Sequence, residues 1–320
     1  MDLRRLRLLF ELSRLGSMRA VAETHGLTTS TVSQQVAALA REVGASLVEP
    51  DGRRVRLTPA GRRLADHAVT ILAAVDAAQA DLDPQAEPAG TLRVGGYATA
   101  IRTALLPVVV ELEESHPGVR VLVSEHEPLE ATDLLAGDDL DLALTYDYNL
   151  APAPLAPGLA AVPLWTTGWG LGVPSAPADD SGAPVGSRVE DLAAWSGHDW
   201  IVNSRNTADE DAVRTLASLA GFTARITHRI DSLDLVEDLV LAGHGVALLP
   251  ASSAPRAGIT LLDLNDPPVL LTAYAVTRLG RERWGPLRLL LERLDRFSRR
   301  TTGRGSPAAA RPVPQPVRPR

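Results

Sequence analysis

The sequence predicts an α/β protein with an N-terminal winged helix-turn-helix, a long helix and a two-lobed α/β domain. Three observations support this fold class: helical apolar spacing broken by tight turns over residues 3–61, a heptad-like apolar seam after residue 59, and alternation of strands and helices from residue 91. At 320 residues with 45% hydrophobic residues, the chain is long enough for two or three domains, each with its own core.

The first three predicted helices form a helix-turn-helix. The first runs from Leu3 to near Gly16, and Ser17 is placed to cap a second helix over residues 18–24. Ala22, Gly26 and Val32 stand four and six residues apart. This spacing supplies a small residue where two helices approach, a glycine free to adopt positive φ, and an apolar plug under the next helix.

The third helix is predicted to begin after Thr28 and to bury Val32, Val36, Leu39 and Val43, which keep a spacing of four, three and four residues. Its opposite face is polar and uncharged. Hydroxyl and amide groups read base edges in the major groove, and a glutamine can bind adenine at two points. The predicted DNA-reading residues are Thr28, Thr29, Ser30, Thr31, Ser33, Gln34 and Gln35.

Residues 47–58 predict two short strands around the hairpin-turn signal Asp51-Gly52. The residues Arg53, Arg54 and Arg56 decorate this hairpin. A basic hairpin beside a recognition helix is a wing, which contacts the sugar-phosphate backbone. The alternative for these arginines is a solvated charged surface.

Thr58-Pro59 predicts the start of a long helix, because a capping hydroxyl precedes proline at the first helical position. An apolar seam of about three heptads follows, which predicts a helix that pairs with a second copy. The alternative is that the stripe packs on its own domain, since alanine at two seam positions makes a weak zipper. The predicted dimerisation residues are Leu64, Ala68, Ile71, Val75, Ala78 and Leu82.

From residue 91 onward, strands alternate with helices, which predicts a mainly parallel sheet covered by helices in two lobes. Residues 150–164 are predicted to be irregular and residues 299–320 disordered. The predicted strands are 91–96, 119–124, 140–145, 168–173, 200–203, 225–230, 246–249, 259–262 and 271–276. The predicted helices are 100–115, 129–136, 189–195, 209–220, 233–241 and 281–297.

Charge is distributed unevenly along the chain. Residues 1–65 hold 11 Arg against 6 acidic residues, residues 66–298 hold 15 Arg against 33 acidic residues, and residues 299–320 hold 6 Arg and no acid. A basic head on an acidic body predicts that only the head meets phosphate. The absence of cysteine excludes disulfides and thiolate chemistry. No apolar run reaches the ~18 residues of a membrane span, so the expected location is cytoplasmic, with no membrane partner.

The N-terminal 65 residues resemble the LysR-type transcriptional regulators. The matching segments are Ser17-Met18-Arg19-Ala20-Val21-Ala22, Val32-Ser33-Gln34-Gln35-Val36 and Gly52-Arg53-Arg54-Val55-Arg56-Leu57-Thr58-Pro59-Ala60-Gly61. Further on, Leu105-Leu106-Pro107, His116-Pro117-Gly118-Val119 and 242–250 resemble the effector domain of the same family, so the likeness covers residues 1–297. Two departures are Pro50, where the family usually has Arg, and Ser30, where Pro is common.

The resemblance implies a DNA-binding domain over residues 1–58, a linker and dimerisation helix over 59–90, and an effector-binding domain over 91–298. Within that domain it implies lobe I at 91–160 plus 267–298 and lobe II at 161–266, similar to periplasmic binding proteins. It also implies a homodimer or homotetramer on double-stranded promoter DNA, controlled by a small-molecule effector between the lobes. RNA polymerase is a further candidate partner. No cofactor and no metal are implied.

The resemblance places effector-binding residues after the first strand of lobe I, at the end of another strand, and on two segments of lobe II. Arg205 together with helix-terminal N–H groups would suit an organic acid. The alternatives are that Arg205 is a surface charge and that His244 only stabilises a turn. The implied effector-binding residues are Tyr97, Thr99, Ala100, Thr145, Tyr146, Asn203, Ser204, Arg205 and His244.

Two other classes of function compete with a regulator. An enzyme is disfavoured because the glycines after the strands lack the GxGxxG spacing, Glu125-His126-Glu127 point to alternating faces, and no trio of nucleophile, base and orienting residue is visible. The chain is therefore expected to have no catalytic residues. The second alternative is a binding protein whose head mediates dimerisation and does not read DNA.

Overall fold

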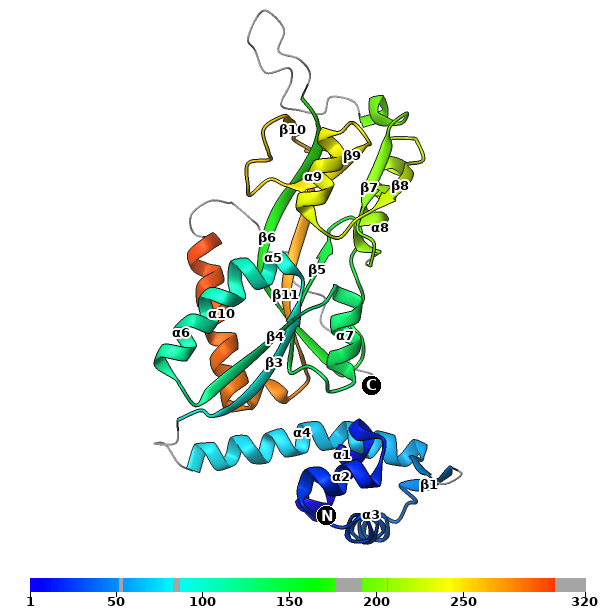
Figure 1. Cartoon of the computed structure of the whole chain (residues 1–320), viewed down its shortest axis with the longest axis vertical. Coiled ribbons are helices and arrows are strands. Elements are labelled where there is room, and N and C mark those ends of the chain that lie inside the picture. Colours follow the sequence, from blue (N-terminus) through cyan, green and yellow to red (C-terminus); the bar gives the residue numbers. More distant parts are fainter. Residues whose placement is uncertain (52–53, 83–86, 176–191, 206, 303–320) are drawn as a thin grey trace, which may run out of the picture. The chain divides into compact units, whose positions relative to one another are not determined.

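The computed structural model describes residues 1–51, 54–82, 87–175, 192–205 and 207–302. Two compact units are distinguished within the chain. Unit 1 comprises Met1–Thr145, Leu155–Val162 and Ala275–Arg293; unit 2 comprises Tyr146–Pro154, Pro163–Tyr274 and Leu294–Arg320. Figure 1 shows the elements of both, and each unit is considered by itself.

The head of unit 1 begins with α1 (Leu3–Leu15), α2 (Met18–His25) and α3 (Thr29–Val43). The helix caps expected from the sequence are confirmed, because the Ser17 hydroxyl accepts from the Ala20 N–H and the Thr28 hydroxyl from the Thr31 N–H. Gly26 ends α2 at φ 62°, a left-handed conformation in which a side chain would be strained. The tight turn between α2 and α3 therefore depends on this glycine.

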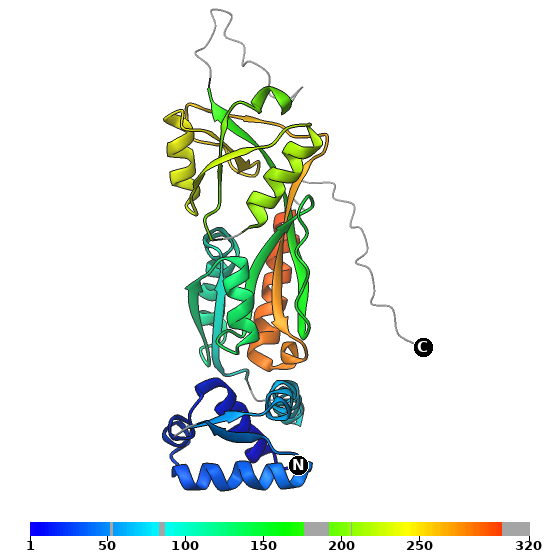
Figure 2. The same cartoon turned by 90° about the vertical axis from the view of Figure 1, so that its right-hand side faces the viewer.

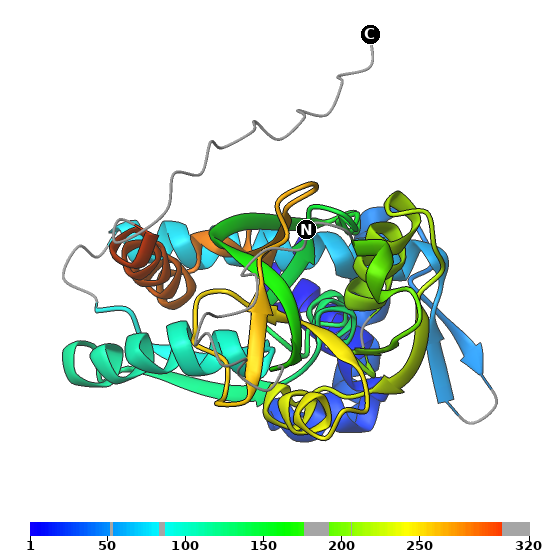
Figure 3. The same ribbon diagram turned by 90° about the horizontal axis from the view of Figure 1, so that it is seen from above.

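The wing and the long helix complete the head. Strands β1 (Val48–Asp51) and β2 (Arg54–Leu57) pair antiparallel, and α4 extends over Pro59–Leu82. Helix α3 packs on α1 and α2, while α1 packs on α4. Figure 2 shows α3 along the margin of the head away from α4, and Figure 3 shows the two wing strands side by side. One apolar core joins these elements, with Leu9 and Leu39 fully buried.

The α/β part of unit 1 is built on the parallel strands β3 (Gly90–Gly96), β4 (Val119–Glu125) and β5 (Leu142–Tyr148), in the order β4-β3-β5. Leu142, Ala143 and Leu144 are at most 1% exposed. Burial on both faces is typical of an inner parallel strand. The connecting helices are α5 (Ala98–Ala100), the π-helical turn η1 (Ile101–Leu105), α6 (Leu106–Ser115) and α7 (Pro128–Ala136).

Unit 2 contains a mixed group of strands in the order β6-β9-β7-β8, with β10 paired to β6. Strands β7, β8 and β9 are parallel, whereas β6 runs antiparallel to β9 and β10. Strand β11 (Val269–Arg278) contributes residues to both units. The other bounds are β6 (Leu159–Pro174), β7 (Asp199–Val202), β8 (Arg225–Arg229), β9 (Val246–Pro250), β10 (Ile259–Leu262), η2 (Leu192–Trp195), α8 (Ala208–Leu219), α9 (Leu233–Leu241), η3 (Arg281–Arg283) and α10 (Gly285–Thr302).

Several predicted bounds were wrong. The strand predicted at 168–173 spans Leu159–Pro174, so part of the segment 150–164 that was predicted to be irregular is also strand. The sequence did not indicate this because Pro163 and two threonines interrupt the apolar pattern. The helix predicted over 100–115 contains a π-helical turn next to Pro107, which has no N–H to donate to the preceding turn. Residues 299–302 continue α10 instead of starting a disordered tail. The remaining residues of the predicted tail, 303–320, lie outside the described part.

Candidate nucleic-acid interface and ligand-binding residues

The outward face of α3 carries the residues predicted to read DNA. Val32, Val36 and Leu39 have no exposed surface and fix the helix on the head core. On the opposite side, Thr28, Thr29, Ser30, Ser33 and Gln34 are exposed, and Thr31 and Gln35 are half-buried. The head therefore exposes hydroxyl and amide groups along this side of α3.

The two neighbouring glutamines differ in their contacts. Gln35 accepts a hydrogen bond from Arg5 Nε at 2.9 Å, and Arg5 also forms an ion pair with Glu42. Arg5 therefore joins α1 to two positions on α3. Gln34 is exposed one residue earlier, so its amide is the better placed of the two to reach a base edge.

The hydroxyl groups at the start of α3 bond to one another. Thr28 Oγ1 lies 2.8 Å from both Ser30 Oγ and Thr31 Oγ1. These bonds position the first turn of the recognition helix before DNA is bound. The departure at Ser30 from the proline common in the family thus adds a hydroxyl to this group.

Arg54 and Arg56 both lie on β2, which is in register with β1, so that Glu49 stands opposite Arg56 and Asp51 opposite Arg54. The side chain of Arg54 lies outside the described part. Arg56 Nε lies 2.9 Å from Glu49 Oε1, and the Arg56 side chain is 64% exposed. An exposed ion pair of this kind contributes little to stability, so Arg56 can exchange its partner for a phosphate. The predicted contact residue Arg53 lies outside the described residues.

The seam of α4 is divided between two environments. Ala68 is fully buried in the head core, and Leu64 and Ile71 pack against that core. The side chain of Ala68 is therefore used within the head and is not presented to a partner helix, because the face toward α1 also includes Ala65 and Leu72. Val75 is half-buried and Ala78 exposed, while the side chain of Leu82 lies outside the described part.

In unit 1, Tyr97 precedes α5 and is 8% exposed, Ala100 is fully buried, and Thr145 lies in β5 at 7% exposure. Burial raises the pKa of Tyr97, and the Glu127 carboxylate raises it further. Glu127, which precedes α7, is only 5% exposed. Sequence reasoning did not assign it as a ligand-binding residue. Glu127 therefore places a buried carboxylate near Tyr97, and the anion-favouring helix end expected after Tyr97 stays a prediction.

In unit 2, Asn203, Ser204 and Arg205 follow the carboxyl end of β7. Asp231 accepts from the Ser204 N–H at 2.9 Å, from the Ser204 hydroxyl at 2.6 Å and from Arg205 Nε at 2.6 Å. Burial opposes ionisation of Asp231, but these bonds hold its pKa below the usual value. Arg205 is therefore engaged by a carboxylate of the same unit.

Asp209 in the first turn of α8 was also not assigned from the sequence as a ligand-binding residue. Burial raises its pKa to about 6, although the neighbouring Tyr148 hydroxyl and Asn203 N–H lower the pKa by favouring the ionised form. Tyr148 is fully buried, and its ring meets those of Tyr146 and Trp169 edge-on, with centroids 6.0 and 5.6 Å away. The structure thus brings the predicted residue Asn203 close to Asp209, an acidic residue that no sequence motif indicated.

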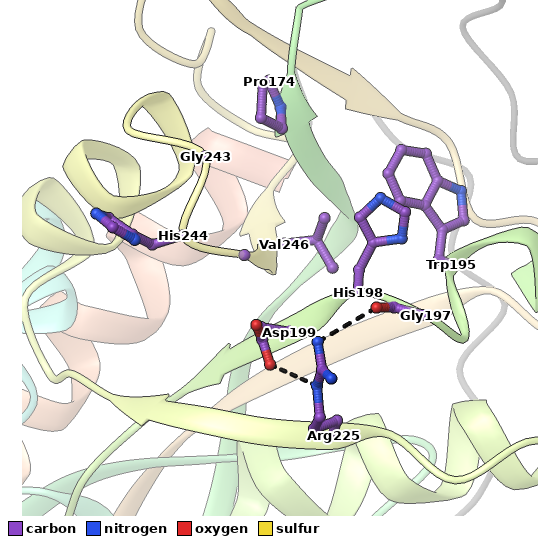
Figure 4. Close-up of a pocket in the computed structure, with 10 residues that line it drawn as sticks. Pro174, Trp195, Gly197, His198, Asp199, Arg225, Gly243, His244 and Val246 are labelled. Atoms are coloured by element: carbon purple, nitrogen blue, oxygen red, sulfur yellow. Dashed lines mark hydrogen bonds and ion pairs between the residues drawn. The ribbon is translucent and has the colours of Figure 1, made fainter.

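His244 lies elsewhere in unit 2. It precedes β9, and because β7 and β9 are parallel, the amino end of β9 and the carboxyl end of β7 are at opposite edges. Figure 4 shows His244 across a cavity of about 450 Å³ from Trp195 and His198. Arg225 on the floor of this cavity is 2.6 Å from Asp199. His244 is therefore not placed with Asn203, Ser204 and Arg205.

Within the part of the chain that the structure describes, no three His, Asp or Glu side chains form a group able to hold a metal ion. None of the described helices combines the length and apolar composition needed to cross a bilayer.

Comparison with known proteins finds family matches to two regions of the chain. Residues 3–62 match the bacterial regulatory helix-turn-helix protein, lysR family, and residues 85–298 match the LysR substrate binding domain. The transcriptional dual regulator GltC of Bacillus subtilis is 27% identical over 88% of this chain and 92% of its own length. A probable hydrogen peroxide-inducible genes activator of Mycobacterium avium is 30% identical over 80% of this chain and 78% of its own.

Solved structures show the same fold. Full-length OxyR C199D from Pseudomonas aeruginosa superposes with a TM-score of 0.67 at 19% identity, covering 93% of this chain and 95% of its own. A Corynebacterium glutamicum OxyR C206 mutant gives a TM-score of 0.54 at 23% identity, covering 94% of both chains.

A winged helix-turn-helix head with a polar recognition helix, followed by a ligand-binding α/β domain, defines a DNA-binding transcription regulator and not an enzyme. The chain belongs to the LysR family of transcriptional regulators and carries the family's effector-binding domain.

Proposed function

We propose that α3 reads promoter DNA through its exposed polar face, with Gln34 as the main base-reading residue. The observation that carries this proposal is the exposed Gln34 amide beside a Gln35 amide that Arg5 already holds. The wing arginines Arg54 and Arg56 bind the backbone phosphates and give affinity without selectivity.

The protein is proposed to bind DNA as a homodimer or homotetramer. Two recognition helices on one duplex need two copies at matching half-sites. With Ala68 used in the head core, the seam residues proposed to contact a second copy are Leu64, Ile71, Val75, Ala78 and Leu82. RNA polymerase in the cytoplasm is the proposed partner of the DNA-bound assembly.

The effector is proposed to bind at the carboxyl end of β7 in unit 2, near Ser204 and Arg205. These residues follow a parallel strand, where ligands of α/β folds commonly bind. The predicted contributions of Tyr97, Thr99 and Thr145, and of His244, remain predictions. A ligand acts on transcription only to the extent that it binds two arrangements of the protein with different affinity.

The name of the Mycobacterium avium relative concerns hydrogen peroxide. Peroxide sensing through thiol oxidation requires a cysteine. This chain of 320 residues contains none. We therefore propose that it responds to a reversibly bound small molecule instead of a thiol oxidant.

A gel-shift titration with the DNA upstream of the protein's own gene tests the DNA-reading proposal. The full chain should retard that DNA selectively and less strongly as salt is raised. Gln34→Ala should relax selectivity at one base pair, and the matched Gln35→Ala should not, because its amide faces Arg5. Equal selectivity for wild type and Gln34→Ala would show that the helix is oriented differently. No retardation at low salt would support a head that only mediates dimerisation.

A further inference from the structure

Asp209 combines burial with an unused hydrogen-bond acceptor. Its Oδ1 is buried and accepts no hydrogen bond from the residues that the structure describes, although the residue as a whole keeps partial exposure. The Tyr148 hydroxyl and the Asn203 N–H both act on the carboxyl group and lower its pKa. A buried carboxylate oxygen without a donor is costly, so its retention calls for an explanation.

The surrounding charges do not neutralise Asp209. The negative charge of Asp231 raises the pKa of Asp209 further. Arg205, which could compensate, directs its Nε to Asp231 at 2.6 Å. This local group of two carboxylates and one guanidinium therefore has a net charge of −1 when all three are ionised.

Aromatic residues pack around Tyr148, the residue whose hydroxyl acts on Asp209. Tyr148 is fully buried, Tyr146 is 7% exposed, and Trp169 is half-buried against Tyr148. An apolar environment strengthens the attraction between a carboxylate and a cation, and it weakens binding of an anion beside the same carboxylate.

We propose that the effector carries a protonated amino group that donates to Asp209 Oδ1. This inference rests on the proposed effector site at the carboxyl end of β7 and names the class of its ligand. An ammonium group supplies both the missing donor and the missing positive charge. An amino acid and a linear diamine offer the same group. The inference replaces the organic acid expected from Arg205 alone, because Asp231 already engages that guanidinium.

A purely structural role for Asp209 must be separated from ligand binding. The bond from the Asn203 N–H shows that the carboxylate also braces the turn before α8. Replacing Asp209 by asparagine keeps an acceptor of similar shape for that bond and removes the charge. Asp211→Asn is the matched control, since Asp211 is an exposed acid on the same first turn.

The experiment uses the full-length protein and isothermal calorimetry after a thermal-shift screen. The probes are the twenty standard amino acids and the linear diamines with three to six carbons, each paired with the analogue in which hydrogen replaces an amino group. At least one amine should raise the melting temperature while its deaminated analogue does not. Asp209→Asn should weaken that binding at least tenfold, and Asp211→Asn should leave it unchanged.

Comparing the diamines with the amino acids shows which of these two kinds of compound supplies the ammonium group. Binding of the deaminated analogues in preference to the amines, binding that survives Asp209→Asn, or the absence of any response to the amines would each overturn the inference. Stabilisation by deaminated acids would leave the proposed effector site intact. Gel-shift retardation is measured on the same proteins, so failure of the amine inference stays distinct from failure of DNA binding. Asp209→Glu, which retains the charge, tests whether lost binding reflects misfolding.

Discussion

Asp209→Asn should stabilise the protein at neutral pH, even though we expect it to weaken effector binding. Burial raises the pKa of Asp209 from 3.8 to about 6. The folded state therefore holds the proton more tightly than the unfolded state, so this group favours folding more as the pH falls from about 6 towards 4. The corresponding cost of ionisation at pH 7 is about 3 kcal/mol. Asparagine is uncharged and removes this cost.

Urea unfolding of the wild type and the variant between pH 4 and pH 8 measures this effect. The variant should be more stable by about 2 to 3 kcal/mol at pH 7, and the difference should shrink towards zero at pH 4. Asp211→Asn should show no such pH-dependent difference, because Asp211 is exposed. The reasoning that the buried, uncompensated charge of Asp209 lowers the stability of the fold would be refuted by either of two results. One is an Asp209→Asn variant that is less stable than the wild type at pH 7, and the other is a stability difference that does not change with pH.

Three further outcomes are expected. Arg56→Gln should weaken binding to all DNA sequences alike and reduce the slope of log affinity against log salt by about 1, measured by gel shift over a salt series; an effect confined to the preferred site would contradict a phosphate contact. Gly61→Ala should destabilise the head by about 1 to 3 kcal/mol, because the added Cβ would lie 2.0 Å from the Leu47 carbonyl oxygen. Gly197→Ala, which meets nothing within 4 Å, is its control in urea unfolding. Thr28→Ala should cost about 1 kcal/mol through loss of the α3 cap, and unchanged stability would mean that water replaces the hydroxyl.

The helix-turn-helix could be predicted from the sequence because its signals are local. Ser17 and Thr28 cap helices through residues three positions away, and Gly26 supplies a left-handed turn between them. Caps, turns and the spacing of Val32 and Val36 depend on neighbours within a few residues. For this reason the order of these helices and the polar face of α3 were available without any tertiary information.

The strands of the α/β part were predicted in order but with less accurate bounds. Strand β6 extends nine residues before its predicted start, because pairing with neighbouring strands maintains an extended backbone through Pro163. Hydrogen bonding between strands distant in sequence decides such bounds, and no local pattern encodes it.

The sequence by itself determined that a basic head with a polar recognition helix precedes an acidic α/β domain, because composition and short-range spacing carry that information. Only the tertiary structure decided which polar side chains remain available to contact DNA or a ligand. Arg5 donates to Gln35, which lies 30 positions away, and Arg205 donates to Asp231, which lies 26 positions away. The fold also buries the Asp209 carboxylate in the first turn of α8, close to the end of β7. The availability of a side chain depends on its partners in space, and folding alone brings those partners together.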